Sequence, residues 1–221
     1  MNYITSLFPH TVITYETDLE NFEGEIYPEE EVLIFNAVEK RKKEFTVGRL
    51  CAKKALSEFG IYCYPVLMNK DRSPIWPEGI VGSITHTMDY CGIALARKDR
   101  IRSVGLDAEI IDEVKEEYRE IICSKDELDW IFQLPSRERQ RYLSLFFSAK
   151  ECFYKFQYPL TREWVGFKEV RVLIEDIKTH EFKIILLKDI NEQFRRNRFF
   201  NGNYFMNNRH VVTGMFLTWS K

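Results

Sequence analysis

The sequence lacks any apolar run long enough to cross a lipid bilayer. A membrane-spanning helix needs about 20 consecutive apolar residues, and a secretory leader opens with a basic region before its apolar segment. The 221-residue chain contains no such run, and Met1–His10 has no basic region. We therefore expect a cytoplasmic protein without a membrane span.

The sequence also has little net charge and no closely spaced cysteines. Its five cysteines are odd in number, and no two suggest a zinc knuckle or a redox motif, so a reduced intracellular chain fits best. The net charge is -2, which gives no overall basic signal for nucleic acid. Any attraction of anions has to be local. With 45% hydrophobic residues, the chain can bury a core as one large domain or as two lobes of about 100 residues each.

The longest helical pattern covers Glu29–Phe59 and is the most basic part of the chain. Gly48 is its only internal interruption, and Gly60 is a natural stop signal. Arg41 and Arg49 lie eight residues apart, about two helical turns, so both can face one side and bind a phosphate with planar, permanently charged groups. The alternative is a solvated helix face without a ligand.

Residues 69–87 predict a stiff turn followed by a short polar strand. Asn-Lys-Asp-Arg-Ser-Pro at 69–74 has the composition of a turn and can wall a flat ligand. Residues 80–87 are typical of a strand with hydroxyl residues around His86. A lone histidine is more often structural than catalytic, but here Ser83, Thr85 and Thr87 flank His86 and add hydrogen-bond donors that suit an anion.

Acidic residues recur on two further elements. Val104–Glu109 is strand-like, and its two-residue period sends Asp107 and Glu109 to the same face. Phe147–Lys155 is typical of a half-buried helix whose charges point to a cleft or its rim. Glu151 on this helix can supply a third acid.

Three carboxylates form an all-oxygen ligand set. Magnesium accepts such a set when phosphates and waters complete its coordination. The sequence therefore predicts a magnesium site that faces phosphate. Two basic residues of the same helix would then lie beside that phosphate, namely Lys150 and Lys155.

These stretches together resemble the 4'-phosphopantetheinyl transferases, and the blocks Gly48-Arg49 and Gly82 to His86 are most similar to the enterobactin-synthase-associated branch. No single motif suffices, but the pair Gly-Leu-Asp-x-Glu and Phe-Ser-x-Lys-Glu-x-x-x-Lys is specific. The resemblance is carried, in the family's order, by residues 41–49, 74–77, 82–86, 104–109 and 147–155.

The resemblance implies an α+β fold made of α/β lobes. The longer members of the family are monomeric pseudo-dimers of two similar lobes with the active site between them. By that analogy residues 1–100 form a lobe that recognises the nucleotide, and residues 101–221 form a lobe that carries the metal and catalytic residues. The boundary falls near Arg97–Ile101, and further strands are expected at 171–174, 182–187 and 211–219.

The resemblance also implies a reaction. It moves 4'-phosphopantetheine from coenzyme A to a serine of an acyl or peptidyl carrier protein and releases 3',5'-ADP. Such enzymes serve peptide, polyketide, siderophore or fatty-acid synthesis. Asp107, Glu109 and Glu151 would hold magnesium against the pyrophosphate, which Lys150 and Lys155 would also meet. Glu151, or water held by it, is the candidate base for the serine hydroxyl.

The nucleotide contacts implied by the resemblance come from the N-terminal lobe. Arg49 and His86, with Arg41, would hold the 3'-phosphate. Because only a protonated imidazole adds charge, we expect the preference for this phosphate to weaken as pH rises through the histidine's titration. The adenine and its surroundings are assigned to Arg72, Ser73, Pro74, Ser83 and Thr85.

Two other classes of protein compete with the enzyme. A non-catalytic nucleotide-binding or metal-binding module would need the basic helix and the acids, but not the two lysines. A nucleic-acid-binding protein is suggested by the alternation of basic and aromatic residues in Arg195–Phe200 and Tyr204. The simpler interpretation of that segment is a surface loop with its aromatic side chains turned inward.

Overall fold

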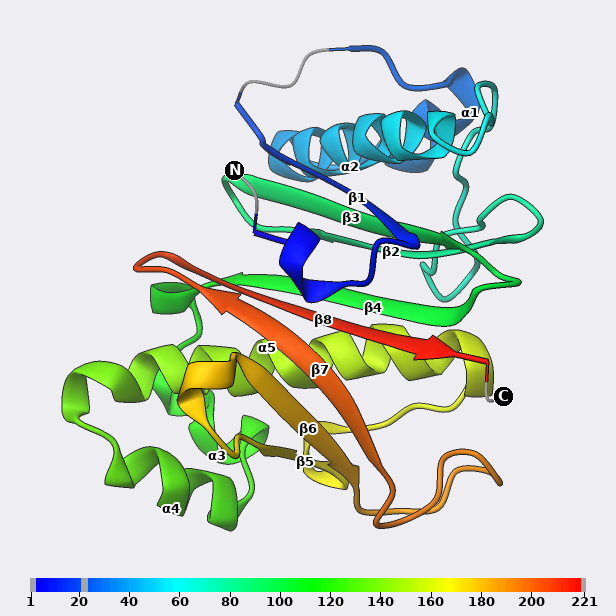
Figure 1. Cartoon of the computed structure of the whole chain (residues 1–221). Helices are drawn as coiled ribbons and strands as arrows, with labels where there is room; N and C mark the ends of the chain where they lie inside the picture. Colours follow the sequence, from blue (N-terminus) through cyan, green and yellow to red (C-terminus); the bar gives the residue numbers. More distant parts are fainter. Residues whose placement is uncertain (1–2, 21–23, 220–221) are drawn as a thin grey trace.

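The computed structural model describes residues 3–20 and 24–219. They form two antiparallel sheets that lie next to each other, each with a long helix on its outer side (Figure 1). This arrangement confirms the mixed α/β fold expected from the sequence. Within the described residues no helix is both long and apolar enough to cross a membrane.

The N-terminal half contains a three-stranded sheet in the order β1–β3–β2. Its strands are β1 (Val12–Asp18), β2 (Ile80–His86) and β3 (Tyr90–Arg97). Helix α2 (Glu39–Ser57) covers this sheet and buries Val47, Cys51 and Ala55 against it, as their spacing of four residues, about one turn, requires. A single turn, α1 (Pro28–Glu31), precedes it.

The C-terminal half contains a five-stranded sheet in the order β4–β8–β7–β6–β5. Helix α5 (Ser136–Thr161) packs on β4 and β8, and α3 (Arg119–Ile122) and α4 (Lys125–Gln133) lie beside α5. The strands are β4 (Ile101–Ile110), β5 (Val170–Leu173), β6 (Glu181–Leu186), β7 (Phe199–Met206) and β8 (His210–Thr218). Short 3-10 turns complete the fold: η1 (Thr5–Leu7), η2 (Val32–Ile34), η3 (Ile111–Glu113), η4 (Glu116–Tyr118), η5 (Phe167–Glu169) and η6 (Ile177–Thr179).

Two sequence expectations about elements need correction. The single helix expected over Glu29–Phe59 is broken, because Val38 is extended and α2 begins at Glu39. Branched residues and Asn36 make the intervening segment a poor helix. The expected surface loop over Arg195–Phe200 ends sooner, because strand β7 begins at Phe199, but Phe200 and Tyr204 are turned inward as expected and are buried in the C-terminal core. Those two aromatic rings are therefore not offered to nucleic acid.

The core has three parts, and one of them joins the two halves. One cluster lies between α2 and the N-terminal sheet, and a second lies among α4, α5 and strands β5–β8. The third contains Tyr90 and Ala94 from the N-terminal sheet together with Val104, Leu106 and Val212 from the C-terminal sheet. Continuous apolar packing therefore fixes the position of one half on the other.

Candidate functional site

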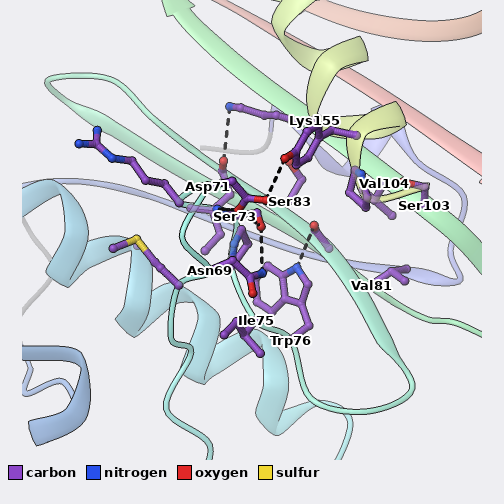
Figure 2. Close-up of a pocket in the computed structure, with 18 of the residues that line it drawn as sticks. Asn69, Asp71, Ser73, Ile75, Trp76, Val81, Ser83, Ser103, Val104 and Lys155 are labelled. Carbon is purple, nitrogen blue, oxygen red and sulfur yellow. Dashed lines mark hydrogen bonds between the residues drawn. The ribbon is translucent and has the colours of Figure 1, made fainter. Parts of the chain in front are cut away.

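A cavity of about 640 Å³ lies where the two halves meet. Figure 2 shows labelled side chains from four parts of the chain around this space: the segment 69–76, β2, β4 and α5. The cavity takes residues from both halves. Those expected from the sequence and found in its lining are Arg41, Arg49, Arg72, Ser73, Pro74, Ser83, His86 and Lys155.

Arg49 is the most buried cation of the cavity. It is 6% exposed, its guanidinium carbon lies 4.2 Å from the centroid of the Phe45 ring, and its Nε lies 3.9 Å from Oε1 of Glu30. Burial, partly offset by Glu30, lowers the pKa of Arg49 to about 10, so it stays charged at neutral pH. Among residues 3–20 and 24–219, its Nε has no hydrogen-bond partner. A buried guanidinium with an unused donor is suited to an anion.

His86 forms a contact pair with Arg41 at the same end of the cavity. Arg41 Nη1 lies 3.0 Å from His86 Nε2, and Glu44 Oε2 lies 3.7 Å from both Arg41 Nη1 and His86 Nδ1. Burial, followed by the charges of Arg41 and Lys155, lowers the pKa of His86 to about 4. The ring is therefore neutral at pH 7, and Nε2 accepts from Arg41. This overturns the expected loss of imidazole charge between pH 6 and 8 in the free protein.

The segment 69–74 forms the turn expected from its sequence. Asn69 N–H donates to Ser73 O and Arg72 N–H donates to Asn69 O, both at 2.9 Å, and Met68 pairs with Pro74 as an isolated bridge. Arg72 has a φ of 67°, in the left-handed region that residues with a Cβ seldom adopt. The turn is thus held in one conformation at the wall of the cavity.

Lys155 connects the cavity to the acidic strand. Its Nζ donates to Asp107 Oδ1 at 2.7 Å and to Ile84 O at 3.4 Å. Burial acts to lower the pKa of Lys155, but the Asp107 charge and hydrogen bond, with Glu151, outweigh it and raise the pKa. Lys155 is therefore a fixed positive charge between the arginine-lined cavity and the acids.

A glycine lets α5 approach the strand closely enough for this contact. A Cβ at Gly105 would overlap the carbonyl oxygen of Cys152 and the side chain of Phe156. Ser103 on the same strand donates to Phe156 O at 2.5 Å. Because β4 and α5 touch at their backbones, the side chains of Asp107 and Lys155 meet directly.

Asp107 perturbs two neighbouring acids, Glu109 and Glu151, electrostatically. Burial, followed by repulsion from Asp107 and then from Glu151, raises the pKa of Glu109 to about 9, with Lys155 opposing. Burial and then Asp107 raise the pKa of Glu151. Asp107 is 4% exposed, and its Oδ2 has no hydrogen-bond partner within the described part of the chain. Such a group of carboxylates is stabilised by added positive charge.

The structure only partly supports the expected metal ligands. Across residues 3–20 and 24–219, no three His, Cys, Asp or Glu side chains are arranged as a ready metal cage, and Lys155 binds one oxygen of Asp107. The chemistry nevertheless suits magnesium, because the donors are all carboxylate oxygens and the orphaned Oδ2 of Asp107 is an unused acceptor. Asp107, Glu109 and Glu151 therefore have the donor chemistry that magnesium requires.

The hydroxyls of Ser83 and Thr85, which were expected to bond to the ligand, bond to the backbone of β4. Ser83 Oγ accepts from Leu106 N–H at 3.1 Å and donates to Leu106 O at 3.3 Å, and Thr85 Oγ1 accepts from Ala108 N–H at 3.0 Å. Thr85 also lies 3.5 Å from Asp107 Oδ1. Both hydroxyls are buried and join β2 to β4, where they replace a backbone ladder. Only Ser83 also lines the cavity.

Lys150 does not reach the site, which corrects its expected place beside phosphate. Its Nζ is buried and donates to Glu127 Oε2 at 2.8 Å, Ile122 O at 2.7 Å and Phe167 O at 2.9 Å. Five residues along a helix correspond to a rotation of about 140°, so Lys150 and Lys155 cannot face the same side of α5. Lys150 holds α5 against the α3–α4 region.

Sequence reasoning missed several residues of the cavity. Tyr154, Tyr158 and Arg162 line it from the C-terminal end of α5, and Asp71 lines it from the 69–74 turn. Spacings of four residues after Tyr154 would have placed Tyr158 and Arg162 on the Lys155 side of the helix. Glu44 also lines the cavity and lies three residues from Arg41, a recognised ion-pair spacing.

Fold and site together define a class of enzyme. A cavity lined by a buried arginine suits an anionic ligand. A lysine at its side contacts one member of an acidic group in which the pKa of Glu109 is strongly raised. This arrangement is typical of enzymes that cleave or transfer phosphate esters with a divalent cation.

Comparison with known proteins identifies the family. The profile described as the 4'-phosphopantetheinyl transferase N-terminal domain matches residues 29–96, and that of the 4'-phosphopantetheinyl transferase superfamily matches residues 103–212. The chain is 37% identical to 4'-phosphopantetheinyl transferase Npt of Nocardia iowensis over 74% of its own length and 71% of the relative's.

Two further relatives agree. PptT of Mycobacterium tuberculosis, also named a 4'-phosphopantetheinyl transferase, is 37% identical over 69% of this chain and 66% of its own length. Enterobactin synthase component D of Salmonella typhi is 35% identical over the same fractions. The chain belongs to the 4'-phosphopantetheinyl transferase superfamily and is an enzyme of that class. The family resemblance drawn from the sequence is confirmed.

Proposed function

We propose that this enzyme transfers 4'-phosphopantetheine from coenzyme A to a serine of an acyl or peptidyl carrier protein and releases 3',5'-ADP. The observation that carries the proposal is the contact between Lys155 and Asp107 at the side of the arginine-lined cavity. It sets a fixed positive charge between a pocket for an anionic nucleotide and the carboxylates.

The cavity accounts for the nucleotide half of coenzyme A. Arg49, with its unused Nε, and Arg41 bind the 3'-phosphate. His86 in its neutral form orients Arg41 through Nε2 and can donate from its other nitrogen. The adenine lies against the turn formed by Arg72, Ser73 and Pro74. Ser83 and Thr85 act indirectly, since they fix β2, which carries His86, to β4.

Lys155 binds the pyrophosphate, and the acids hold the metal. Asp107, Glu109 and Glu151 are the ligands, and bound magnesium supplies positive charge that stabilises the departing 3',5'-ADP. A cation would also offset the repulsion that raises the pKa values of Glu109 and Glu151. Lys150 is excluded from the catalytic residues by its buried contacts.

Glu151 is the group that takes the proton of the carrier serine, directly or through water. Its raised pKa makes the carboxylate more basic than an exposed glutamate, which brings it closer to the value that general-base catalysis favours near neutral pH. Its position on α5, four residues before Lys155, puts it on the same side of the helix as the pyrophosphate ligand.

The partner is a carrier protein, and the enzyme acts as a monomer in the cytoplasm. Residues 1–100 and 101–221 are inferred to be two lobes, which form the proposed pseudo-dimer around the cavity. The partly exposed Phe132, with Leu134 beside it on the C-terminal half, offers an apolar contact for the carrier. Relatives named enterobactin synthase component D support a siderophore pathway as one destination.

Intact-mass analysis of candidate apo carrier proteins tests the proposal. With coenzyme A and magnesium, each modified carrier should gain one phosphopantetheine group, and an equal amount of 3',5'-ADP should appear. Asp107→Ala should lower kcat/KM by about 10²-fold or more, or ~3 kcal/mol in the barrier. Nucleotide binding without any 3',5'-ADP release would instead support a non-catalytic nucleotide-binding module.

A further inference from the structure

A contact of Asp71 fastens the turn 69–74, here called the strap, to the opposite half of the molecule. Asp71 Oδ1 accepts from Ser73 N–H at 2.9 Å and from the Ser73 hydroxyl at 2.5 Å. Its Oδ2 accepts from Tyr158 OH at 2.9 Å and from Arg162 Nη1 at 3.3 Å. One carboxylate therefore shapes the strap with one oxygen and binds the end of α5 with the other.

The backbone on both sides of this contact is in a conformation that needs support. Arg72, next to Asp71, has a φ of 67°, and Arg162, directly after α5, has a φ of 59°. Residues with a Cβ adopt this left-handed region at a cost of about 1 kcal/mol or more. Such conformations persist where the surroundings hold them, and they collect at ligand clamps.

The charge of Asp71 is retained over the whole useful pH range. Its hydrogen bonds from the Ser73 side chain, the Ser73 backbone and Tyr158, in that order, lower its pKa to about 2. Arg162 adds to the effect, and the pKa of Tyr158 is raised mainly by the same hydrogen bond. The contact is therefore released by motion of the strap and not by protonation of the carboxylate.

The strap and the end of α5 face the same space. Arg72, Ser73 and Pro74 line the cavity from one side, and Tyr158 and Arg162 line it from the other. Figure 2 shows Asp71 and Ser73 close together on the strap, with Lys155 lying above them. The Asp71 contact therefore joins two walls of the cavity directly to each other.

We propose that Asp71 is a positioning residue that latches the strap to Tyr158 and Arg162, and that this latch has to open for the nucleotide to enter or leave. The latch deepens the proposed function and rests on it, because the nucleotide is coenzyme A or 3',5'-ADP. When the latch is closed, it keeps the strap against the adenine. Open, it frees one wall of the cavity.

Stopped-flow dissociation of coenzyme A and of 3',5'-ADP tests the latch. Tyr158→Phe removes the hydrogen bond between Tyr158 and Asp71 and leaves the bonds from Ser73 to Asp71 within the strap. Asp71→Asn changes the bonds within the strap as well as those to Tyr158 and Arg162. We expect about 5-fold faster dissociation in Tyr158→Phe and about 10-fold in Asp71→Asn. KM for coenzyme A should rise, and KM for the carrier should not change. Asp176→Asn is the matched control, since Asp176 Oδ1 accepts from Lys178 N–H at 2.9 Å in an exposed turn that does not line the cavity.

The double variant Asp71→Asn/Tyr158→Phe separates a latch from independent ligand contacts. If the latch exists, the nucleotide should dissociate from the double variant no faster than from Asp71→Asn alone. If the two single-variant effects on the dissociation rate multiply, the latch is overturned. Unchanged dissociation in all variants, or an equal rise in KM for the carrier, would also overturn the latch and leave the proposed function in place. If the wild-type protein binds neither nucleotide, both proposals fail together.

Discussion

Lys150 and Lys155 are only five residues apart on α5, yet their environments give them unrelated tasks. Lys150 is enclosed by one carboxylate and two carbonyl oxygens, and Lys155 reaches the cavity. The sequence motif shows only that both lysines are present. Because they are rotated by about 140° from each other on the helix, they cannot both contact the same ligand.

The first prediction compares these two lysines. Lys150→Ala should lower the free energy of unfolding by about 3 to 5 kcal/mol, because it leaves the buried Glu127 without its counter-ion. Lys155→Ala should lower kcat/KM by about 10²-fold or more. It also leaves the buried Asp107 without its counter-ion, but the loss of stability should be smaller because Lys155 is 29% exposed whereas Lys150 is 1% exposed. Urea denaturation and turnover on both variants give the comparison. A stable but inactive Lys150→Ala protein would return that residue to the site.

A second prediction concerns the 3'-phosphate. Wild-type enzyme should prefer coenzyme A over 3'-dephospho-coenzyme A by about 1.5 to 3 kcal/mol, or roughly 10- to 100-fold, and Arg49→Ala should remove most of this preference. Because His86 is neutral above a pKa of about 4, the preference should stay flat between pH 6 and 8. An equal loss for both substrates in Arg49→Ala would place the arginine elsewhere.

The same histidine gives a prediction for stability. Its folded pKa of about 4 lies below the unfolded value of 6.5, so the unfolded chain binds more protons between these values. The contribution of His86 is therefore complete above pH 6.5 and is lost as pH falls towards 4. Unfolding free energies measured across this range should fall less steeply in His86→Asn than in wild type. Identical slopes would contradict the lowered pKa.

For single residues, the sequence best predicts which side of a helix a side chain faces, because spacing along the helix determines it. Arg41 and Arg49 both face the cavity because eight residues complete about two turns of helix. The pKa of His86 and the contacts of Asp71 could not be predicted, because they depend on groups 45 and 87 positions away that only the fold brings near.

At the scale of elements, the joint between β2 and β4 is made by side chains. The two strands belong to different sheets, and the hydroxyls of Ser83 and Thr85 bond to the backbone of Leu106 and Ala108. Alternation along the strand predicts that Ser83 and Thr85 share a face. It does not say that another strand's amides lie opposite them, which is why both were assigned to the ligand.

Thr85→Val tests this joint with little change in volume. The variant leaves the buried N–H of Ala108 without an acceptor and removes the hydroxyl beside Asp107, so it should cost about 1 to 3 kcal/mol of stability. Thr17→Val is a suitable control, since the Thr17 hydroxyl donates to the neighbouring Asp18 O. Equal stability of the two variants, measured by urea denaturation, would show that the hydroxyl contributes nothing to the joint.

At the scale of the whole molecule, the apolar cluster shared by the two sheets holds the two halves together. Tyr90 and Ala94 on one side and Val104, Leu106 and Val212 on the other are almost completely excluded from water. Separating the halves would expose all of them, at about 25 cal/mol for each Å² of apolar surface. The family resemblance gives two lobes, but their dependence on each other becomes visible only in this packing.

We therefore predict that the two halves unfold together. Calorimetry should give a single transition with equal calorimetric and van't Hoff enthalpies. Leu106→Ala in the shared cluster should shift that transition as one peak. Two separate transitions in the wild-type protein would show that the halves are independent domains.

The contact between the first turn and the last two strands has a consequence for protein synthesis. Leu7 O accepts from Asn203 Nδ2 across 196 residues, and β4 forms its backbone ladder with β8. At roughly 5 to 20 residues per second, a ribosome needs about 10 to 40 s to make the chain between these partners. β4, which carries Asp107 and Glu109, is made earlier than its partner: Ile110 pairs with His210, 100 residues later, so β4 waits about 5 to 20 s for β8 at the same rate. The nascent chain therefore cannot assemble its acidic site until β8 has been translated.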